Sequence, residues 1–302
     1  DRTLSPAESA ILYNIRLPRL LLGGLVGAGL AVSGVLMQGL FRNPLADPSL
    51  VGVSAGAGLG AVAAIVLGST LPTAIHALTG MYMAPVFAFF GGWITTLILY
   101  QLASLRGYTN VTTMLLAGIV LGALANALTG ILIFVADDRQ LRDLTFWGLG
   151  SLAGTNWVKL AAAAPILLLG LAGAPLLARG LNAMAMGEAA ARHMGIPVEW
   201  VKRGAIFTVA AMTGAAVAVS GGIGFVGIVA PHVLRLAIGP DHRALIPASA
   251  LFGAALLIAA DTVARLIVAP AELPIGILMA LIGAPVFLWL LLARRPGMGA
   301  QG

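Results

Sequence analysis

The chain has 302 residues, of which 60% are hydrophobic and 9% are charged, and its mean hydropathy is +1.01. A soluble domain carries about 25% charged residues, because its surface must be wetted. The composition therefore excludes a soluble globular protein and a disordered chain, and the lack of cysteine excludes a disulfide scaffold. Long uninterrupted apolar runs exclude a transmembrane barrel, which alternates over short segments. We predict an all-α fold, a polytopic bundle of transmembrane helices.

Eight apolar runs approach the roughly 20 residues that a spanning helix needs. The run over 204–238 is too long for one span and contains Ser220-Gly221-Gly222, a pair of helix breakers after a serine. Dividing it there gives nine predicted spans, at residues 18–41, 50–71, 81–103, 111–135, 157–178, 204–219, 223–238, 245–269 and 274–293. An odd number of spans places the termini on opposite sides of one transmembrane domain, residues 1–302.

The net charge of +6 and the pI near 10.5 do not indicate a nucleic-acid surface. The basic residues stand in ones and twos between apolar runs, as loop charges that orient membrane spans do. Their distribution favours a cytoplasmic C-terminus. The longest connection on that side, about 180–203, contains a helix-compatible stretch from Gly187 to Gly195, followed by Pro197. Such a short helix suits either a structural loop or a docking surface for a soluble partner.

The sequence offers little for covalent chemistry. Gly52-Val53-Ser54-Ala55-Gly56 matches a nucleophile pattern, but it opens an apolar helical run with no strand before it, so chance explains it better than an intramembrane hydrolase. Lys159 and Lys202 both follow valine, which excludes a Gly-Lys-Ser/Thr phosphate loop. The histidines lack metal-ligand spacing, so no metal is expected. We expect no enzyme activity, and any ATP hydrolysis must lie on another chain.

Two sets of charged residues allow more than one interpretation. Asp261 lies inside an apolar run, where a coupling carboxylate of a secondary transporter would lie, but Arg265 follows one helical turn later and an ion pair explains it more simply. Arg16, Arg19 and Arg265 are predicted to face outward. They can extend to the membrane interface, or form forked salt bridges to carboxylates of a docked partner.

Motifs along nearly the whole chain resemble one protein family. They are Ile15-Arg16-Leu17-Pro18-Arg19, Arg42-Asn43-Pro44-Leu45-Ala46-Asp47-Pro48, Leu115-Leu116-Ala117-Gly118, Phe146-Trp147-Gly148-Leu149-Gly150-Ser151-Leu152, Gly222-Ile223-Gly224-Phe225-Val226-Gly227, Pro231-His232-Val233-Leu234-Arg235 and Glu272-Leu273-Pro274-Ile275-Gly276. In this order they resemble the permease subunit of type II ABC importers, which take up vitamin B12, iron-siderophores and haem.

The resemblance implies a homodimer of ten-helix subunits in the bacterial inner membrane. Two cytoplasmic ATPase subunits, which hold ATP and Mg²⁺, and a periplasmic binding protein complete the importer, and the permease itself binds no cofactor. This chain begins where the first family helix should already have ended, and we expect that helix in the native protein. Carried over by position, the docking residues are Arg16, Arg19 and Arg265, the cytoplasmic gate residues are Asn43, Leu45, Val111 and Thr112, and the ATPase-coupling residues are Gly187, Glu188, Ala191, Arg192 and Gly195.

The predicted outer loop from Asp137 to Trp147 looks most like that of the haem-importing members. Arg139 and Arg142 would meet haem propionates at the substrate entrance through charge-assisted hydrogen bonds. The alternative is that both arginines pair with the acidic residues of the loop and order it. Haem is therefore the favoured substrate, with an iron-siderophore or cobalamin as alternatives.

Overall fold

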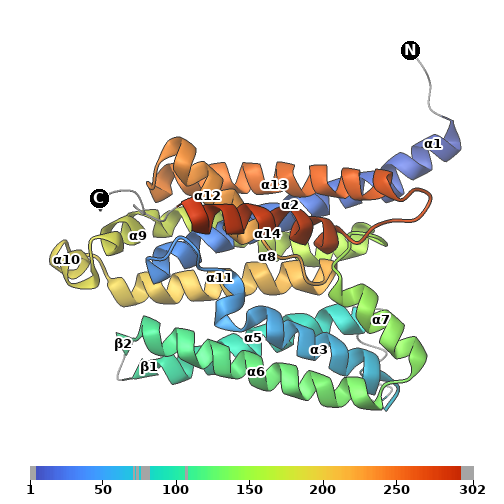
Figure 1. The fold of residues 1–302 in the computed structure, drawn as a ribbon, viewed down its shortest axis with the longest axis horizontal. Helices are drawn as coiled ribbons and strands as arrows, with labels where there is room; N and C mark the ends of the chain where they lie inside the picture. The colour runs from blue at the N-terminus through green and yellow to red at the C-terminus, as the bar shows by residue number, and fades with distance from the viewer. Residues whose placement is uncertain (1–4, 71, 73–74, 76–81, 106–107, 294–302) are drawn as a thin grey trace, which may run out of the picture.

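The computed structural model describes residues 5–70, 72, 75, 82–105 and 108–293, and nearly all of them are helical (Figure 1). A π-helical turn, Leu12–Arg16, joins the first two helices. The helices are α1 (Pro6–Ile11), α2 (Leu17–Phe41), α3 (Val53–Leu67), α5 (Met83–Ala103), α6 (Val111–Val135), α7 (Asp138–Gly148), α8 (Trp157–Gly173), α9 (Ala178–Ala185), α10 (Glu188–His193), α11 (Val198–Ser220), α12 (Val226–Ile238), α13 (His242–Ile267) and α14 (Ile275–Ala293). Two short antiparallel strands, β1 (Ser104–Leu105) and β2 (Tyr108–Thr109), pair Ser104 with Thr109.

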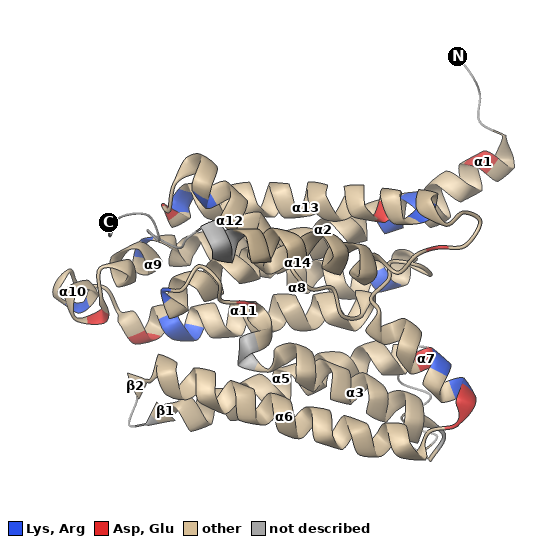
Figure 2. Ribbon diagram, viewed as in Figure 1, with Lys and Arg blue, Asp and Glu red and all other residues tan. Residues whose placement is uncertain are grey.

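By length and composition, six helices of the described chain are able to cross a membrane. Three shorter apolar helices, α3, α12 and α14, occupy the remaining predicted spans, which confirms the polytopic helical fold. Predicted boundaries at residues 71 and 81 lie outside the described residues. Most charged residues lie toward the two ends of the bundle, and few lie between them (Figure 2).

The helical run that holds the first predicted span begins at Pro6 rather than at residue 18, and α11 begins at Val198 rather than at residue 204. Two further differences concern the segments between spans. The span predicted to end at residue 178 continues through a 3-10 turn, Ala174–Leu177, into α9. The outer segment treated as a loop forms α7, because Asp137 and Gln140 make a reciprocal capping box at its start. Leu144 of α7 is buried against Val62 and Val66 of α3, so the apolar face of α7 fixes it on the bundle.

Helix α2 lies at the centre of the bundle and is buried along most of its length. It touches α13 backbone to backbone, because a Cβ atom at Gly27 would overlap the carbonyl of Gly253. The same kind of contact joins α3 to α5, where a Cβ atom at Gly91 would overlap the carbonyl of Gly56. Small residues at such crossings let helix backbones approach in lipid.

The chain breaks between α11 and α12, as predicted from Ser220-Gly221-Gly222. Gly221 has φ +70° and Phe225 has φ +67°, so both lie in the left-handed region, which costs Phe225 some strain. The break packs against the turn after α7, where the Ser151 amide donates to the Ser220 carbonyl at 2.7 Å. The segment between the two helices is extended, which leaves α12 only 13 residues long.

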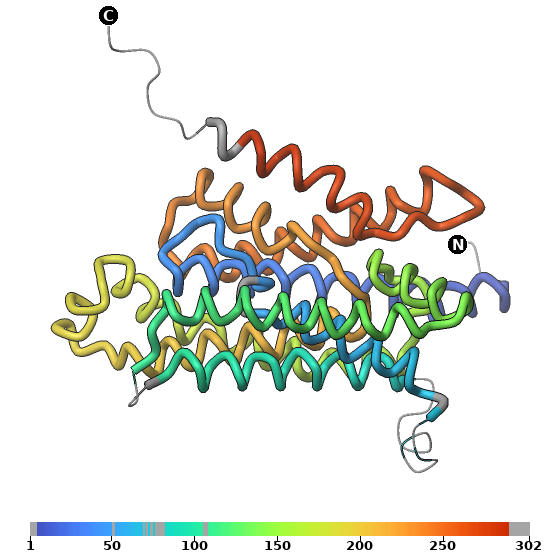
Figure 3. The backbone as a smooth tube through the Cα atoms, turned by 60° about the horizontal axis from the view of Figure 1, so that its bottom comes forward, coloured from blue at the N-terminus to red at the C-terminus, as the bar shows by residue number. Residues whose placement is uncertain are grey.

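The two ends of the bundle carry different elements (Figures 1 and 3). We name them the α10 end, where α10, β1 and β2 lie, and the α7 end, where α1 and α7 lie. The described chain starts at the α7 end, and α14 runs toward the α10 end. Figure 3 shows α14 leaning away from the rest of the bundle as it does so.

Candidate functional site

The three predicted docking arginines lie together at the α7 end. Arg16, Arg19 and Arg265 line one pocket of about 310 Å³, although Arg265 lies 246 positions after Arg19 in the sequence (265 − 19). Arg16 ends the π-helical turn before α2 and is exposed. Arg265 lies in the last turn of α13 and is partly exposed. The fold therefore brings the predicted set to one place.

Arg19 is committed to partners within the chain. Its Nε and Nη2 atoms donate to the Asp261 carboxylate at 3.0 and 2.9 Å, and its Nη1 donates to both Glu272 oxygens at 2.9 and 3.0 Å. The Arg19 and Asp261 side chains are only 12% and 8% exposed. Asp261 also accepts an ion pair from Arg265 at 3.3 Å, the pair expected from their one-turn spacing. A partner carboxylate would find Arg16 and Arg265 more accessible than Arg19.

Two of the predicted gate residues and two of the predicted coupling residues share a cavity at the α10 end. The cavity measures about 270 Å³, and its walls include Val111 and Thr112 of α6 together with Glu188 and Arg192 of α10. Asn110 caps α6 by accepting from the Thr113 amide at 3.0 Å, which fixes the first turn of that helix.

Asn43 and Leu45, the other gate residues, follow the end of α2 in a turn that starts beside this cavity. Arg42 lines the cavity and ends α2 in the left-handed conformation, with φ 50°. The Asn43 side-chain oxygen then accepts from the Leu45 amide at 3.0 Å. The turn is thus held by its own side chain, and Asn43 and Leu45 do not themselves line the cavity.

Helix α10 is a compact unit between two glycines. Gly187 has φ +109° and Gly195 has φ +78°, conformations that residues other than glycine rarely adopt. Ala191 faces inward and is buried, whereas Arg192 is largely exposed and lies over the Tyr108 ring of β2 at 5.2 Å. All five predicted coupling residues therefore lie in or next to one short helix at the tip of the α10 end.

Lys202 and Glu199 of α11 are residues at this end that the sequence analysis did not single out. The Lys202 side chain is 2% exposed, and its ammonium donates to Glu188 at 2.8 Å and to the Thr109 carbonyl at 2.7 Å. Glu199 accepts from the Thr109 amide at 2.8 Å. The available signal was the spacing of Glu199 and Lys202, which are three residues apart on one helix.

A neighbouring link holds α9 to the start of α13. Asp241 caps α13, accepting from the Arg243 amide at 2.9 Å and from the Asn182 side chain at 2.6 Å. These two hydrogen bonds hold the pKa of the Asp241 carboxyl below its ordinary value, the Arg243 amide being the larger cause. The Asn182 oxygen in turn accepts from the His242 amide at 3.0 Å.

A cavity of about 430 Å³ lies halfway along the bundle. Leu30 of α2 and Thr213 of α11, both far from the ends of their helices, line it with Asp47, Ser49 and Ser54. The segment after α2 thus folds back into the bundle and carries a carboxylate there, which apolar periodicity cannot reveal. Ser54 lies in the first turn of α3 after a 3-10 turn, and among the residues lining the cavity there is no histidine to activate it.

Arg139 and Arg142 are both exposed on α7. Within the described part of the chain neither forms an ion pair, so pairing with the neighbouring acidic residues does not order this segment. The capping box does so instead, and it leaves both guanidinium groups available at the α7 end.

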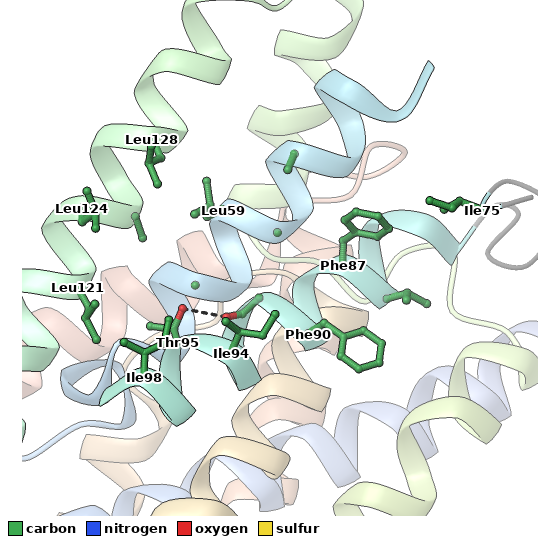
Figure 4. Close-up of a pocket in the computed structure, with 16 residues that line it drawn as sticks. Leu59, Ile75, Phe87, Phe90, Ile94, Thr95, Ile98, Leu121, Leu124 and Leu128 are labelled. Carbon is green, nitrogen blue, oxygen red and sulfur yellow. Dashed lines mark hydrogen bonds between the residues drawn. The ribbon is translucent and has the colours of Figure 1, made fainter. Parts of the chain in front are cut away.

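Another cavity, of about 600 Å³, is apolar (Figure 4). Side chains of α3, α5 and α6, among them Leu59, Phe90 and Leu124, line it. Its labelled polar group, the Thr95 hydroxyl, already donates to the Gly91 carbonyl at 2.9 Å. This cavity has no charged lining residue and suits apolar contact alone. Among the described residues no group of three or more His, Cys, Asp or Glu side chains is placed to hold a metal ion.

Comparisons with known proteins show relatives along nearly the whole chain. Residues 2–293 match the FecCD transport family. The chain is 47% identical to the hemin transport system permease HmuU of Yersinia pestis, over 94% of this chain and 84% of that protein. It is 46% identical to the cobalamin import system permease BtuC of Halobacterium salinarum, over 94% of this chain and 74% of that protein. It is 42% identical to the vitamin B12 import system permease BtuC of Escherichia coli O9:H4, over 96% of this chain and 86% of that protein.

A solved structure of a metal-chelate type ABC transporter in an inward-facing conformation has the same fold. Its TM-score is 0.87 at 33% identity, over 97% of this chain and 90% of that one. PsaBC from Streptococcus pneumoniae, in complex with Fab, is 17% identical with a TM-score of 0.61, over 93% of this chain and 92% of that chain, and shares the fold alone.

Proposed function

The chain belongs to the FecCD transport family and is a permease of a type II ABC importer, and we propose that its substrate is haem. Two observations support haem over cobalamin or an iron-siderophore. One is the 47% identity to a hemin permease. The other is the pair of exposed arginines, Arg139 and Arg142, which suits the two carboxylates of haem. The 46% identity to a cobalamin permease makes cobalamin the main alternative.

In the proposed assembly two copies of this chain span the inner membrane as a homodimer. The α10 end faces the cytoplasm and contacts two ATPase subunits, which hold ATP and Mg²⁺. The α7 end faces the periplasm and receives the substrate-loaded binding protein. This orientation follows the distribution of basic residues along the sequence and places the C-terminus in the cytoplasm.

Docking of the binding protein is assigned to the arginine pocket at the α7 end. Arg16 and Arg265 would take carboxylates of the binding protein in forked, charge-assisted pairs. Arg19 would hold Asp261 and Glu272 in place, so that the pocket keeps its shape when the partner leaves. In this proposal Arg19 positions the docking surface and does not itself contact the binding protein.

The single observation that carries the transport mechanism is the cavity shared by α6 and α10. ATP binding on the partner subunits would displace α10, and the first turn of α6, with Val111 and Thr112, would move with it. Asn43 and Leu45, in the turn after α2, would form the other part of the gate. Substrate would then pass while the α7 end holds the binding protein, with no covalent chemistry on this chain.

The test is reconstitution of the chain with its ATPase subunits in liposomes, followed by ATPase and uptake assays. We expect haem-loaded binding protein to stimulate both activities more than empty or cobalamin-loaded protein. Arg142→Gln should weaken uptake of haem, whereas Lys159→Gln, which removes a cation from the first turn of α8, serves as the charge-matched control. Stimulation by cobalamin alone would overturn haem but keep the importer. Uptake driven by an ion gradient without the ATPase would overturn the mechanism in favour of a secondary transporter.

A further inference from the structure

The buried ammonium of Lys202 joins α10 and its own helix, α11, to β2, which lies far from both in the sequence. It donates to Glu188 of α10 at 2.8 Å, to the Thr109 carbonyl of β2 at 2.7 Å, and to Glu199 of its own helix at 3.4 Å. Its side chain is 2% exposed, whereas those of Glu188 and Glu199 are 30% and 22% exposed. Lys202 is therefore the interior point of this cluster, and the two carboxylates lie between it and solvent.

Strand β2 leads directly from this cluster to the predicted gate. Thr109 is held at both backbone groups: its carbonyl accepts from Lys202, and its amide donates to Glu199 at 2.8 Å. The next residue, Asn110, caps α6, and Val111 and Thr112 follow in the first turn. One residue, Asn110, thus separates the Lys202 contact at Thr109 from Val111.

A buried ammonium resists separation from its carboxylate. Removing one partner leaves an uncompensated charge in a medium of low dielectric constant, so breaking the pair is far less favourable than moving both partners together. When α10 is displaced, Glu188 therefore keeps Lys202 with it, and the Thr109 carbonyl follows through the same ammonium. Arg192, which bridges Glu188 at 3.8 Å and Glu199 at 3.2 Å, closes the cluster on its solvent side.

We propose that Lys202 is the positioning residue that transmits displacement of α10 to the first turn of α6. The inference deepens the proposed function and rests on it, because it requires α10 to contact the ATPase and Thr112 to lie at the gate. A merely structural role would make Lys202 necessary for folding, but it would not make the response of α6 to nucleotide depend on this side chain.

The experiment uses the absence of cysteine from the chain. Single substitutions Ala189→Cys on α10 and Thr112→Cys on α6 place a thiol at two exposed positions. Each is made in the complete complex with its ATPase subunits, in liposomes, and the rate of maleimide labelling is measured with and without ATP and Mg²⁺. The same pair of probes is then combined with Lys202→Met, which keeps the apolar stem, and with Arg203→Met, which removes the neighbouring exposed cation.

We expect nucleotide to change labelling at both probes in the otherwise unchanged chain and with Arg203→Met. With Lys202→Met the change at the Ala189→Cys thiol should remain and the change at the Thr112→Cys thiol should be lost. Retention of the Thr112→Cys response with Lys202→Met would overturn the inference alone. If the otherwise unchanged chain shows no response at either probe, the proposed coupling and gate assignments are wrong, and the inference falls with them.

A second variant covers the case in which Lys202→Met does not assemble. Glu188→Gln removes the charge that α10 offers to Lys202, at a partly exposed side chain that tolerates a neutral amide. It should reduce the nucleotide response of the Thr112→Cys thiol while leaving that of the Ala189→Cys thiol. A full response at Thr112→Cys in this variant would overturn the inference.

Discussion

Replacing Arg19 by methionine should destabilise the protein rather than only weaken docking. The substitution removes both the bidentate contact to Asp261 and the contact to Glu272 at the α7 end. Asp261 is 8% exposed, so its carboxylate would keep only the longer pair to Arg265. Loss of the Asp261 contact and loss of the Glu272 contact should change the free energy of unfolding by different amounts, because the two carboxylates differ in burial.

The magnitude follows from that difference. Breaking a buried pair by removing one partner costs up to about 3–5 kcal/mol when the remaining charge is uncompensated, and here Asp261 keeps only the 3.3 Å pair to the partly exposed Arg265. The contact to Glu272, which is 42% exposed, adds at most about 1 kcal/mol, since solvent screens it. Arg16→Met, at an exposed side chain, should change the free energy of unfolding by less than about 0.5 kcal/mol.

Equilibrium unfolding in mixed micelles measures both variants, and binding of the periplasmic protein to the reconstituted complex gives the second readout. Arg16→Met should weaken that binding about tenfold to a hundredfold, corresponding to the loss of roughly 1.5–3 kcal/mol from a charged hydrogen bond. The double substitution Arg19→Met/Asp261→Leu should recover much of the lost stability, because it removes the unpaired charge.

The reasoning would be refuted by either of two results. One is an Arg19→Met protein as stable as Arg16→Met, which would mean that the buried contact contributes nothing. The other is a double variant whose loss equals the sum of the two single losses, which would mean that Arg19 and Asp261 are not coupled.

Three further predictions concern other parts of the fold. Gly27→Val should abolish folded protein in a detergent-extraction assay, because a side chain there would overlap the backbone of α13. The control Gly58→Ala places its methyl group in open space and should be tolerated. Equal yields of the two variants would contradict the close contact between α2 and α13. Asp137→Ala should cost about 1 kcal/mol of local stability and speed hydrogen exchange in α7, and unchanged exchange would exclude the capping box as its cause. The lowered pKa of Asp241 means that its contribution is present above the unfolded-state pKa and lost as pH falls through the folded-state value. Wild type and Asp241→Asn should therefore differ in thermal stability at pH 7 and converge under strongly acidic conditions, and a constant difference would refute the assignment.

The lengths of the apolar runs predict most of this fold, because each span must satisfy its own backbone hydrogen bonds in lipid. The nine predicted spans and the break at Ser220-Gly221-Gly222 all correspond to observed elements. Helix α7 was not predicted because its segment is polar, although the residue types of the capping pair, Asp137 and Gln140, are a helix-start signal in the sequence. The apolar composition of a run identifies a span, but it does not predict how the polar segments between spans fold.

The site was predicted less completely, since its contacts join distant segments. Asp261 and Arg265 are one turn apart and their pairing was foreseen, but the partner that buries Asp261 is Arg19, at the other end of the sequence. In the sequence Lys202 resembles the other loop cations, and only the fold shows that Glu188 and Thr109 contact its ammonium. Hydropathy also missed Asp47, because a carboxylate in a connection gives no sign that the connection turns back into the bundle.

The glycine contacts described for α2 with α13 and for α3 with α5 divide the molecule mechanically. Where backbone touches backbone few side chains lie between the helices, so we expect each pair to move as one rigid body. Between the pairs lies α11, whose Val217 and Ala218 meet Ala57 and Ala88 of the second pair through side chains. Side-chain contacts of this kind permit small sliding movements, whereas interlocked backbones do not. We therefore expect relative movement of the two pairs to take place at α11, the helix that carries Lys202 at its α10 end.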